Sequence, residues 1–103
     1  MKYIEDLDLN ECTLKFGKYV NGRTQFSVVT LEGEQICCAT LNCAWHSISD
    51  KEVIIKDYQE NEGIYDILFA ANVVSKVKRR IPVGLHQAYV CDLLIKPKFK
   101  YVR

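Results

Sequence analysis

Residues 36–46 concentrate the side chains of this sequence that could do chemistry. The segment holds three of the five cysteines, one of the two histidines and the single tryptophan. Cys43 and His46 are three residues apart, a spacing at which both side chains can reach one metal ion. Thiolate and imidazole are ligands that Zn²⁺ prefers. The segment therefore predicts part of a zinc site.

A straight strand cannot supply the four ligands that tetrahedral zinc requires. Cys37 and Cys43 would face the same side of a regular strand, but they would lie about 20 Å apart. The missing ligands must come from elsewhere in the chain, and the last predicted strand carries Cys91. We predict a structural zinc site formed by Cys38, Cys43, His46 and Cys91. The alternative is that all five cysteines are small, buried apolar side chains.

Two cysteine–histidine pairs, Cys43 with His46 and Cys91 with His86, are candidates for nucleophilic chemistry. Such chemistry needs a thiolate that a neighbouring imidazole activates. Neither pair is accompanied by a glycine-rich loop that could stabilise an oxyanion. The sequence therefore predicts a protein without catalytic activity.

The elements that would position these residues are mostly strands. Residues 13–20 and 24–31 alternate apolar and polar side chains, and the Asn21-Gly22 dipeptide between them suits a tight type I′ turn. Further strands are predicted at 35–41, 51–58 and 87–95. Because tight turns join the first three strands, they form an antiparallel meander.

One helix interrupts the strands. Ile64, Ile67, Leu68 and Ala71 follow the helical spacing of one apolar face, and Asn61 is a suitable N-cap. Residues 75–84 are predicted to be a basic connection. The sequence thus predicts an α+β fold, in which a mainly antiparallel sheet of four to six strands carries one helix packed on a face.

The chain has 103 residues, a length that predicts a single domain over residues 1–103. Residues 1–11 form an acidic lead-in and residues 96–103 a basic tail. The apolar runs are too short to span a membrane, and the N-terminus lacks the pattern of a signal peptide. An odd number of cysteines without a secretion signal favours a reducing cytoplasm.

Charge is distributed unevenly along the chain. Residues 1–75 carry 12 acidic and 6 basic side chains, whereas residues 76–103 carry 1 and 8. Such a cluster of cations can contact a protein or the phosphates of a nucleic acid, although the near-neutral net charge disfavours nucleic acid. We predict that the partner-binding cations are Lys76, Lys78, Arg79 and Arg80.

Three aromatic residues, Trp45, Tyr58 and Tyr65, are candidate anchors for a partner, since aromatic side chains often dominate interfaces. For Trp45 we instead expect packing in the core.

Two short motifs, Glu60-Asn61-Glu62-Gly63 and Pro82-Val83-Gly84, lie at the helix start and before the last strand. With this order of elements, residues 12–95 resemble a family of small uncharacterised proteins of phages, conjugative plasmids and other mobile elements. In that family the segment matching residues 37–46 is an ordinary aliphatic strand, so the cysteines and His46 are a departure.

The resemblance implies a non-catalytic phage or mobile-element protein that works in the cytoplasm of the host cell. It would bind and inhibit a host defence protein, in its sharpest form a Cas9-type CRISPR nuclease, as a type II anti-CRISPR protein with a structural zinc. The alternative function is a nucleic-acid-binding accessory protein that uses the basic 76–80 loop.

Overall fold

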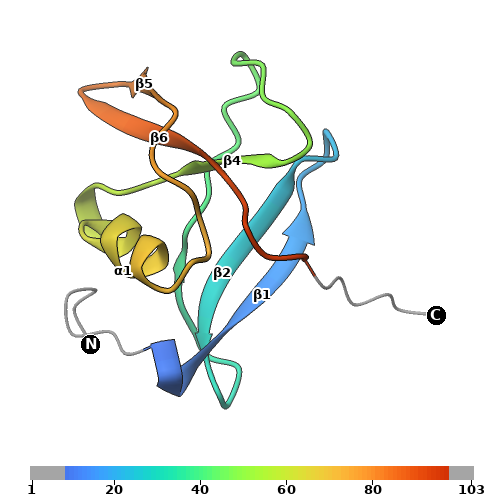
Figure 1. Ribbon diagram of the computed structural model, residues 1–103, viewed down its shortest axis with the longest axis vertical. Coiled ribbons are helices and arrows are strands. Elements are labelled where there is room, and N and C mark those ends of the chain that lie inside the picture. Colours follow the sequence, from blue (N-terminus) through green and yellow to red (C-terminus); the bar gives the residue numbers. More distant parts are fainter. Residues whose placement is uncertain (1–8, 98–103) are drawn as a thin grey trace.

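The computed structural model describes residues 9–97, which form two three-stranded antiparallel sheets and one helix (Figure 1). A 3₁₀ turn, Leu9–Glu11, leads into the first sheet, whose strands are β1 (Cys12–Lys18), β2 (Thr24–Thr30) and β3 (Gln35–Cys38). The predicted α+β fold and N-terminal meander are confirmed. Parts of the acidic lead-in and of the basic tail, residues 1–8 and 98–103, lie outside the described residues.

The second sheet has the strand order β4 (Glu52–Ile55), β6 (His86–Asp92) and β5 (Arg79–Val83). An antiparallel bridge between Thr40 and Ile55 links it to the first sheet. The third strand is shorter than predicted, because residues 39–41 leave β3 and hydrogen-bond to neighbouring strands. The Ala39 N–H donates to the Phe26 carbonyl, and the Leu41 N–H donates to the Ile54 carbonyl.

The prediction that residues 75–84 form only a connection is wrong, because β5 lies within them. Ile81 is buried against the sheet, while Arg80 and Pro82 point outward and are exposed. Proline cannot donate to a strand ladder, but β5 is the edge strand of its sheet as the described residues form it, so the missing N–H is tolerated.

The helix α1 (Ile64–Ala70) packs Ile64 and Leu68 into the main core, against β2 and β4. Its N-cap is Gly63, with a φ of 97°, so the prediction that Asn61 caps it is wrong. The Asp57 carboxylate instead accepts hydrogen bonds from the N–H groups of Gly63 and Tyr65, at 3.1 and 2.8 Å.

Asn61 has a different task. It lies in a 3₁₀ turn, Gln59–Asn61, is 2% exposed, and donates from its side-chain nitrogen to the Cys38 carbonyl at 2.7 Å. The bond joins the approach to the helix to the end of β3. Two conspicuous residues of the Glu60-Asn61-Glu62-Gly63 motif, Asn61 and Gly63, therefore have structural roles.

The core has two parts, on opposite faces of the second sheet. The main cluster lies between the first sheet, α1 and one face of the second sheet. The smaller cluster lies on the other face, where Ile54, Ile81 and Val90 meet Cys43. Residues 41–48 therefore cover the face of the second sheet that is turned away from the main cluster.

Candidate functional site

The four predicted zinc ligands do not meet in the structure. Cys91 pairs with Val53 and belongs to the main core cluster, whereas Cys43 belongs to the cluster on the opposite face of the same sheet. The part of the chain that the structure describes contains no group of three or more His, Cys, Asp or Glu side chains able to hold a metal. A zinc ion shared by these residues would require a different arrangement of the segment.

Cys38 is separated from the other thiols by the pleat of β3. Cys37 pairs with the core residue Val28 and is buried in the main cluster, so its neighbour Cys38 faces the opposite side, beside Ser27. The side-chain nitrogen of Gln25 lies 3.7 Å from the Cys38 sulfur. Burial opposes ionisation of Cys38, but hydrogen bonds from Thr40, Ser27 and Gln25 outweigh it and lower the thiol pKa.

The other core thiols are poor nucleophiles. Burial raises the pKa of Cys91 to about 12 and that of Cys37 to about 11, and burial also raises the pKa of Cys43. His86, the predicted partner of Cys91, stacks instead on Tyr58, with ring centroids 4.4 Å apart. These thiols behave as small apolar core residues, which are mostly protonated at neutral pH.

Cys43 and His46 are the two ends of a tight turn. The His46 N–H donates to the Cys43 carbonyl at 3.0 Å. The Arg23 guanidinium holds both ends of this turn: Nη1 donates to the Cys43 carbonyl at 2.8 Å and Nη2 to the His46 carbonyl at 2.6 Å. One arginine side chain thus fixes the backbone of residues 43–46.

The expectation that Trp45 packs in the core is wrong. Trp45 sits at the apex of the turn, is 66% exposed, and contacts the His46 ring edge-on with centroids 5.9 Å apart. The turn presents the largest side chain of the protein to solvent on a backbone that is held in place from both ends.

The tip of the β1–β2 hairpin lies against the same turn. The Asn21 side chain donates to the side-chain oxygen of Asn42 at 3.0 Å, and the Tyr19 hydroxyl donates to the Thr40 carbonyl at 3.1 Å. Val20, at the same tip, is fully exposed. We call the exposed side chains of this end, Val20, Asn42, Ala44 and Trp45, the Trp45 surface.

A buried carboxylate, that of Glu52, holds the basic side chains next to this end of the molecule. Glu52 is only 6% exposed, and both of its oxygens accept hydrogen bonds. Arg79 donates to the Glu52 carboxylate through Nη1 at 3.0 Å and through Nη2 at 3.2 Å. The Lys78 Nζ lies 2.8 Å from the same carboxylate, and the Ser49 N–H donates to it at 2.9 Å. The bonds from Arg79 and Lys78 lower the Glu52 pKa to about 2, so the carboxylate is ionised at neutral pH.

The predicted basic partner site is largely part of this support. Lys78 also pairs with Asp92 at 3.1 Å, and Arg79 reaches the turn, since its Nε donates to His46 Nε2 at 3.0 Å. Arg79 and Arg80 belong to strand β5, not to a loop. The structure thus brings together two features that are far apart in the sequence, the residue 43–46 turn and the basic segment.

The other two predicted cations, Lys76 and Arg80, are exposed, and neither forms an ion pair within residues 9–97. Arg80 lies over the Tyr89 ring, 5.3 Å from its centroid. Of the remaining candidate anchors, Tyr65 is half-buried, donates to the Ser75 carbonyl at 2.9 Å and contacts Tyr89 edge-on. Tyr65 is therefore better described as a packing residue than as an anchor.

Removing the Arg23 side chain should loosen the turn. We expect Arg23→Ala to lower the free energy of unfolding by about 1–2 kcal/mol, because two charge-assisted hydrogen bonds are lost at a partly exposed site. We also expect a lower fluorescence anisotropy of Trp45, which is the only tryptophan. Arg23→Lys, which keeps the charge but not the two-pronged contact, is the matched control. Equal anisotropy in Arg23→Ala and the wild type would contradict this role of Arg23.

Comparison with known proteins identified no matching family model, no matching curated protein and no matching solved structure. Within the described residues, no helix is long and apolar enough to cross a membrane.

Proposed function

We propose that this chain is a non-catalytic binding protein that attaches to a partner protein through the Trp45 surface. The observation that supports this proposal is the exposed indole of Trp45 on a turn held by Arg23. Exposed tryptophans on rigid supports are typical binding hot spots, because little conformational entropy is lost when they are buried. The partner would offer an apolar recess that receives the indole ring.

The resemblance to proteins of phages and mobile elements provides the partner class. A host defence protein is the proposed target, and a Cas9-type nuclease is its sharpest case. Binding would inhibit the target by occupying its surface, without chemistry on the part of this chain.

The alternative of nucleic-acid binding through residues 76–80 receives less support. Glu52 and Asp92 already neutralise Lys78, and Glu52 also pairs with Arg79. Two of the four cations are thus engaged within the protein, which leaves Lys76 and Arg80 to contact phosphates. Binding to DNA or RNA that weakens steeply with salt, without a protein partner, would favour this alternative.

The proposal is tested by comparing the wild type with Trp45→Ala in binding to purified Cas9-type nuclease and in affinity capture from host cells. We expect Trp45→Ala to weaken binding by at least about 2 kcal/mol, as at a typical hot spot. Phe69→Ala is the matched control, because Phe69 is also exposed but lies on α1.

Binding that is equal in wild type and Trp45→Ala would contradict the proposed surface. Failure to bind the nuclease, with Trp45-dependent capture of another defence protein, would contradict only the named target.

A further inference from the structure

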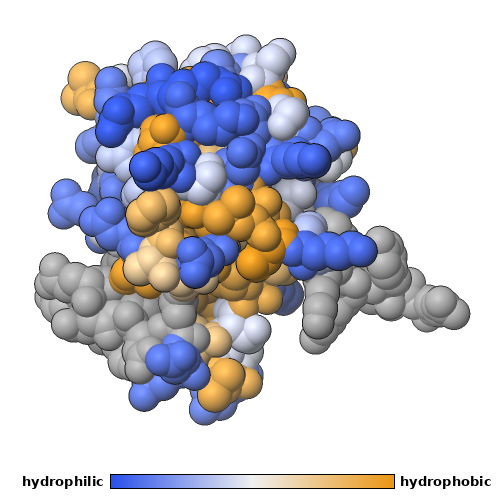
Figure 2. All heavy atoms as spheres, in the orientation of Figure 1, coloured by the Kyte–Doolittle hydropathy of each residue, from blue (hydrophilic) through white to orange (hydrophobic). Residues whose placement is uncertain are grey.

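A second surface lies away from the Trp45 turn. A groove of about 470 Å³ runs between β1 and the segments that follow α1 and β6. Its apolar lining includes Leu14, Ala71, Val73 and Ile95. Figure 2 shows apolar side chains gathered on this face of the molecule, over the end of α1 and the segment after β6, with hydrophilic side chains above them.

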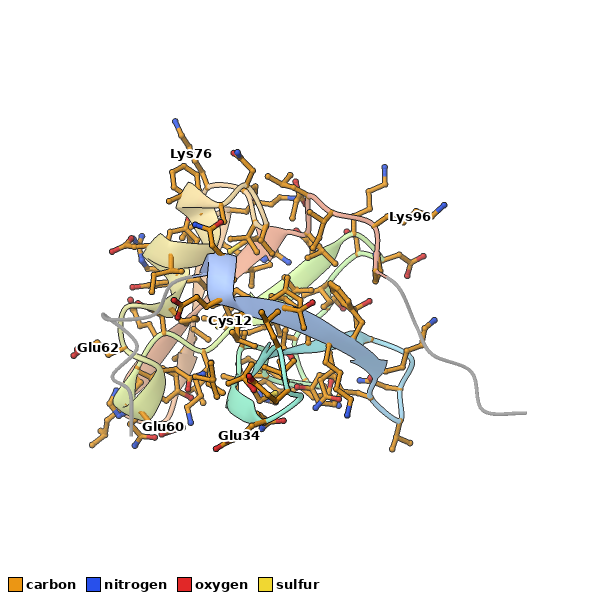
Figure 3. The ribbon with its side chains drawn as sticks, turned by 90° about the horizontal axis from the view of Figure 1, so that it is seen from below. Cys12, Glu34, Glu60, Glu62, Lys76 and Lys96 are labelled. Atoms are coloured by element: carbon orange, nitrogen blue, oxygen red, sulfur yellow. The ribbon has the colours of Figure 1, made fainter. Side chains whose placement is uncertain are left out.

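A lysine lines this groove. Lys96 is the single charged residue among the described residues that line it. Figure 3 places Lys76 and Lys96 on one side of the molecule, whereas Glu34, Glu60 and Glu62 lie on the opposite side. An apolar groove on the lysine-bearing side complements a ligand that combines apolar and acidic groups.

We propose that this groove docks a segment of a partner protein in which apolar residues are flanked by aspartate or glutamate. Apolar side chains of the segment pack against Leu14, Val73 and Ile95, and a carboxylate beside them faces Lys96. Carboxylates beyond the groove face Lys76, on the same side of the molecule. Burial of the apolar side chains supplies affinity, and the lysines select against basic segments. This docking does not depend on the Trp45 surface.

The test is a selection of random displayed peptides on the purified full-length chain, followed by affinity measurements on synthetic copies of the enriched peptides. We expect enrichment of peptides that combine apolar residues with Asp or Glu. Their affinity should fall about tenfold or more in the double variant Lys76→Glu/Lys96→Glu, because attraction becomes repulsion.

Lys15→Glu is the matched control, because Lys15 alternates with Leu14 along β1 and points to the other face of the strand. Ala71→Trp, which adds a bulky side chain to the lining of the groove, should abolish binding without changing any charge.

The proposal would be overturned if the selection enriched no peptide, or only peptides without acidic residues. It would also be overturned if both the lysine double variant and Ala71→Trp bound the enriched peptides with unchanged affinity. Peptides whose binding is lost in Trp45→Ala instead would belong to the Trp45 surface. Binding to vesicles containing phosphatidylserine, without any enriched peptide, would assign the groove to a lipid surface and would also overturn the proposal.

Discussion

Replacing Glu52 with alanine is expected to lower the free energy of unfolding by about 2–3 kcal/mol, because removal of one partner leaves the others of a buried ionic cluster uncompensated. The loss stays below the upper end of such effects, since water can reach the freed side chains of Lys78 and Arg79, which are 43% and 38% exposed. Urea unfolding followed by circular dichroism measures the change. Glu34→Ala removes an exposed carboxylate and should cost far less.

The same carboxylate makes stability depend on pH. Hydrogen bonds from Arg79 and Lys78 hold the Glu52 pKa at about 2 in the folded chain, below its ordinary value of 4.5. A depressed pKa contributes stability that is present above pH 4.5 and is lost as the pH falls toward 2. We therefore expect the wild type to lose more stability than Glu52→Ala over this range. Parallel pH profiles of the two proteins would show that Glu52 is not the group responsible.

Replacing Asn61 with leucine should lower the free energy of unfolding by about 1–3 kcal/mol, the cost of leaving a buried polar group without its partner. The Cys38 carbonyl loses the donor that joins β3 to the helix approach, and the larger apolar side chain must fit a fully enclosed position. Thermal and urea unfolding measure the effect.

Asn42→Ala is the control for Asn61→Leu, because it removes an asparagine side chain whose oxygen accepts a hydrogen bond from Asn21 at an exposed site. If Asn61→Leu and Asn42→Ala were equally stable, loss of the buried bond to Cys38 would not explain the effect of Asn61→Leu on stability.

Local patterns predicted most of the architecture. Alternation in β1 and β2 predicted a hairpin, and its register pairs Cys12 with Thr30. The predicted type I′ turn at Asn21-Gly22 is wrong, because Gly22 has a positive φ of 86° but Asn21 does not. The spacing of Ile64 and Leu68 predicted the buried face of α1. In these elements neighbouring residues determine the structure, so sequence periodicity is informative.

Features that depend on contacts between distant residues were missed. β5 was hidden by its proline and its charges, because an edge strand needs neither a continuous ladder nor an apolar outer face. Nothing near Arg23 in the sequence indicates that its guanidinium holds residues 43 and 46. Trp45 was expected in the core, yet it lies on an exposed turn that is fixed by a residue 20 positions or more away.

The candidate metal site shows the same limit. Spacing could indicate that Cys43 and His46 lie near each other, and the structure confirms a tight turn between them. The spacing in the sequence could not indicate that Cys43 and Cys91 lie on opposite faces of one sheet, because that depends on which face residues 41–48 cover.

The contacts that hold the Trp45 turn also determine when it can form during folding. Arg23 reaches it across 20 and 23 residues, and Arg79 reaches His46 across 33. Contacts that close such long loops form late, after local hairpins have already reduced the entropy of the chain. Trp45 would therefore reach its final environment only after both sheets have assembled, so its fluorescence would report the last stage of folding.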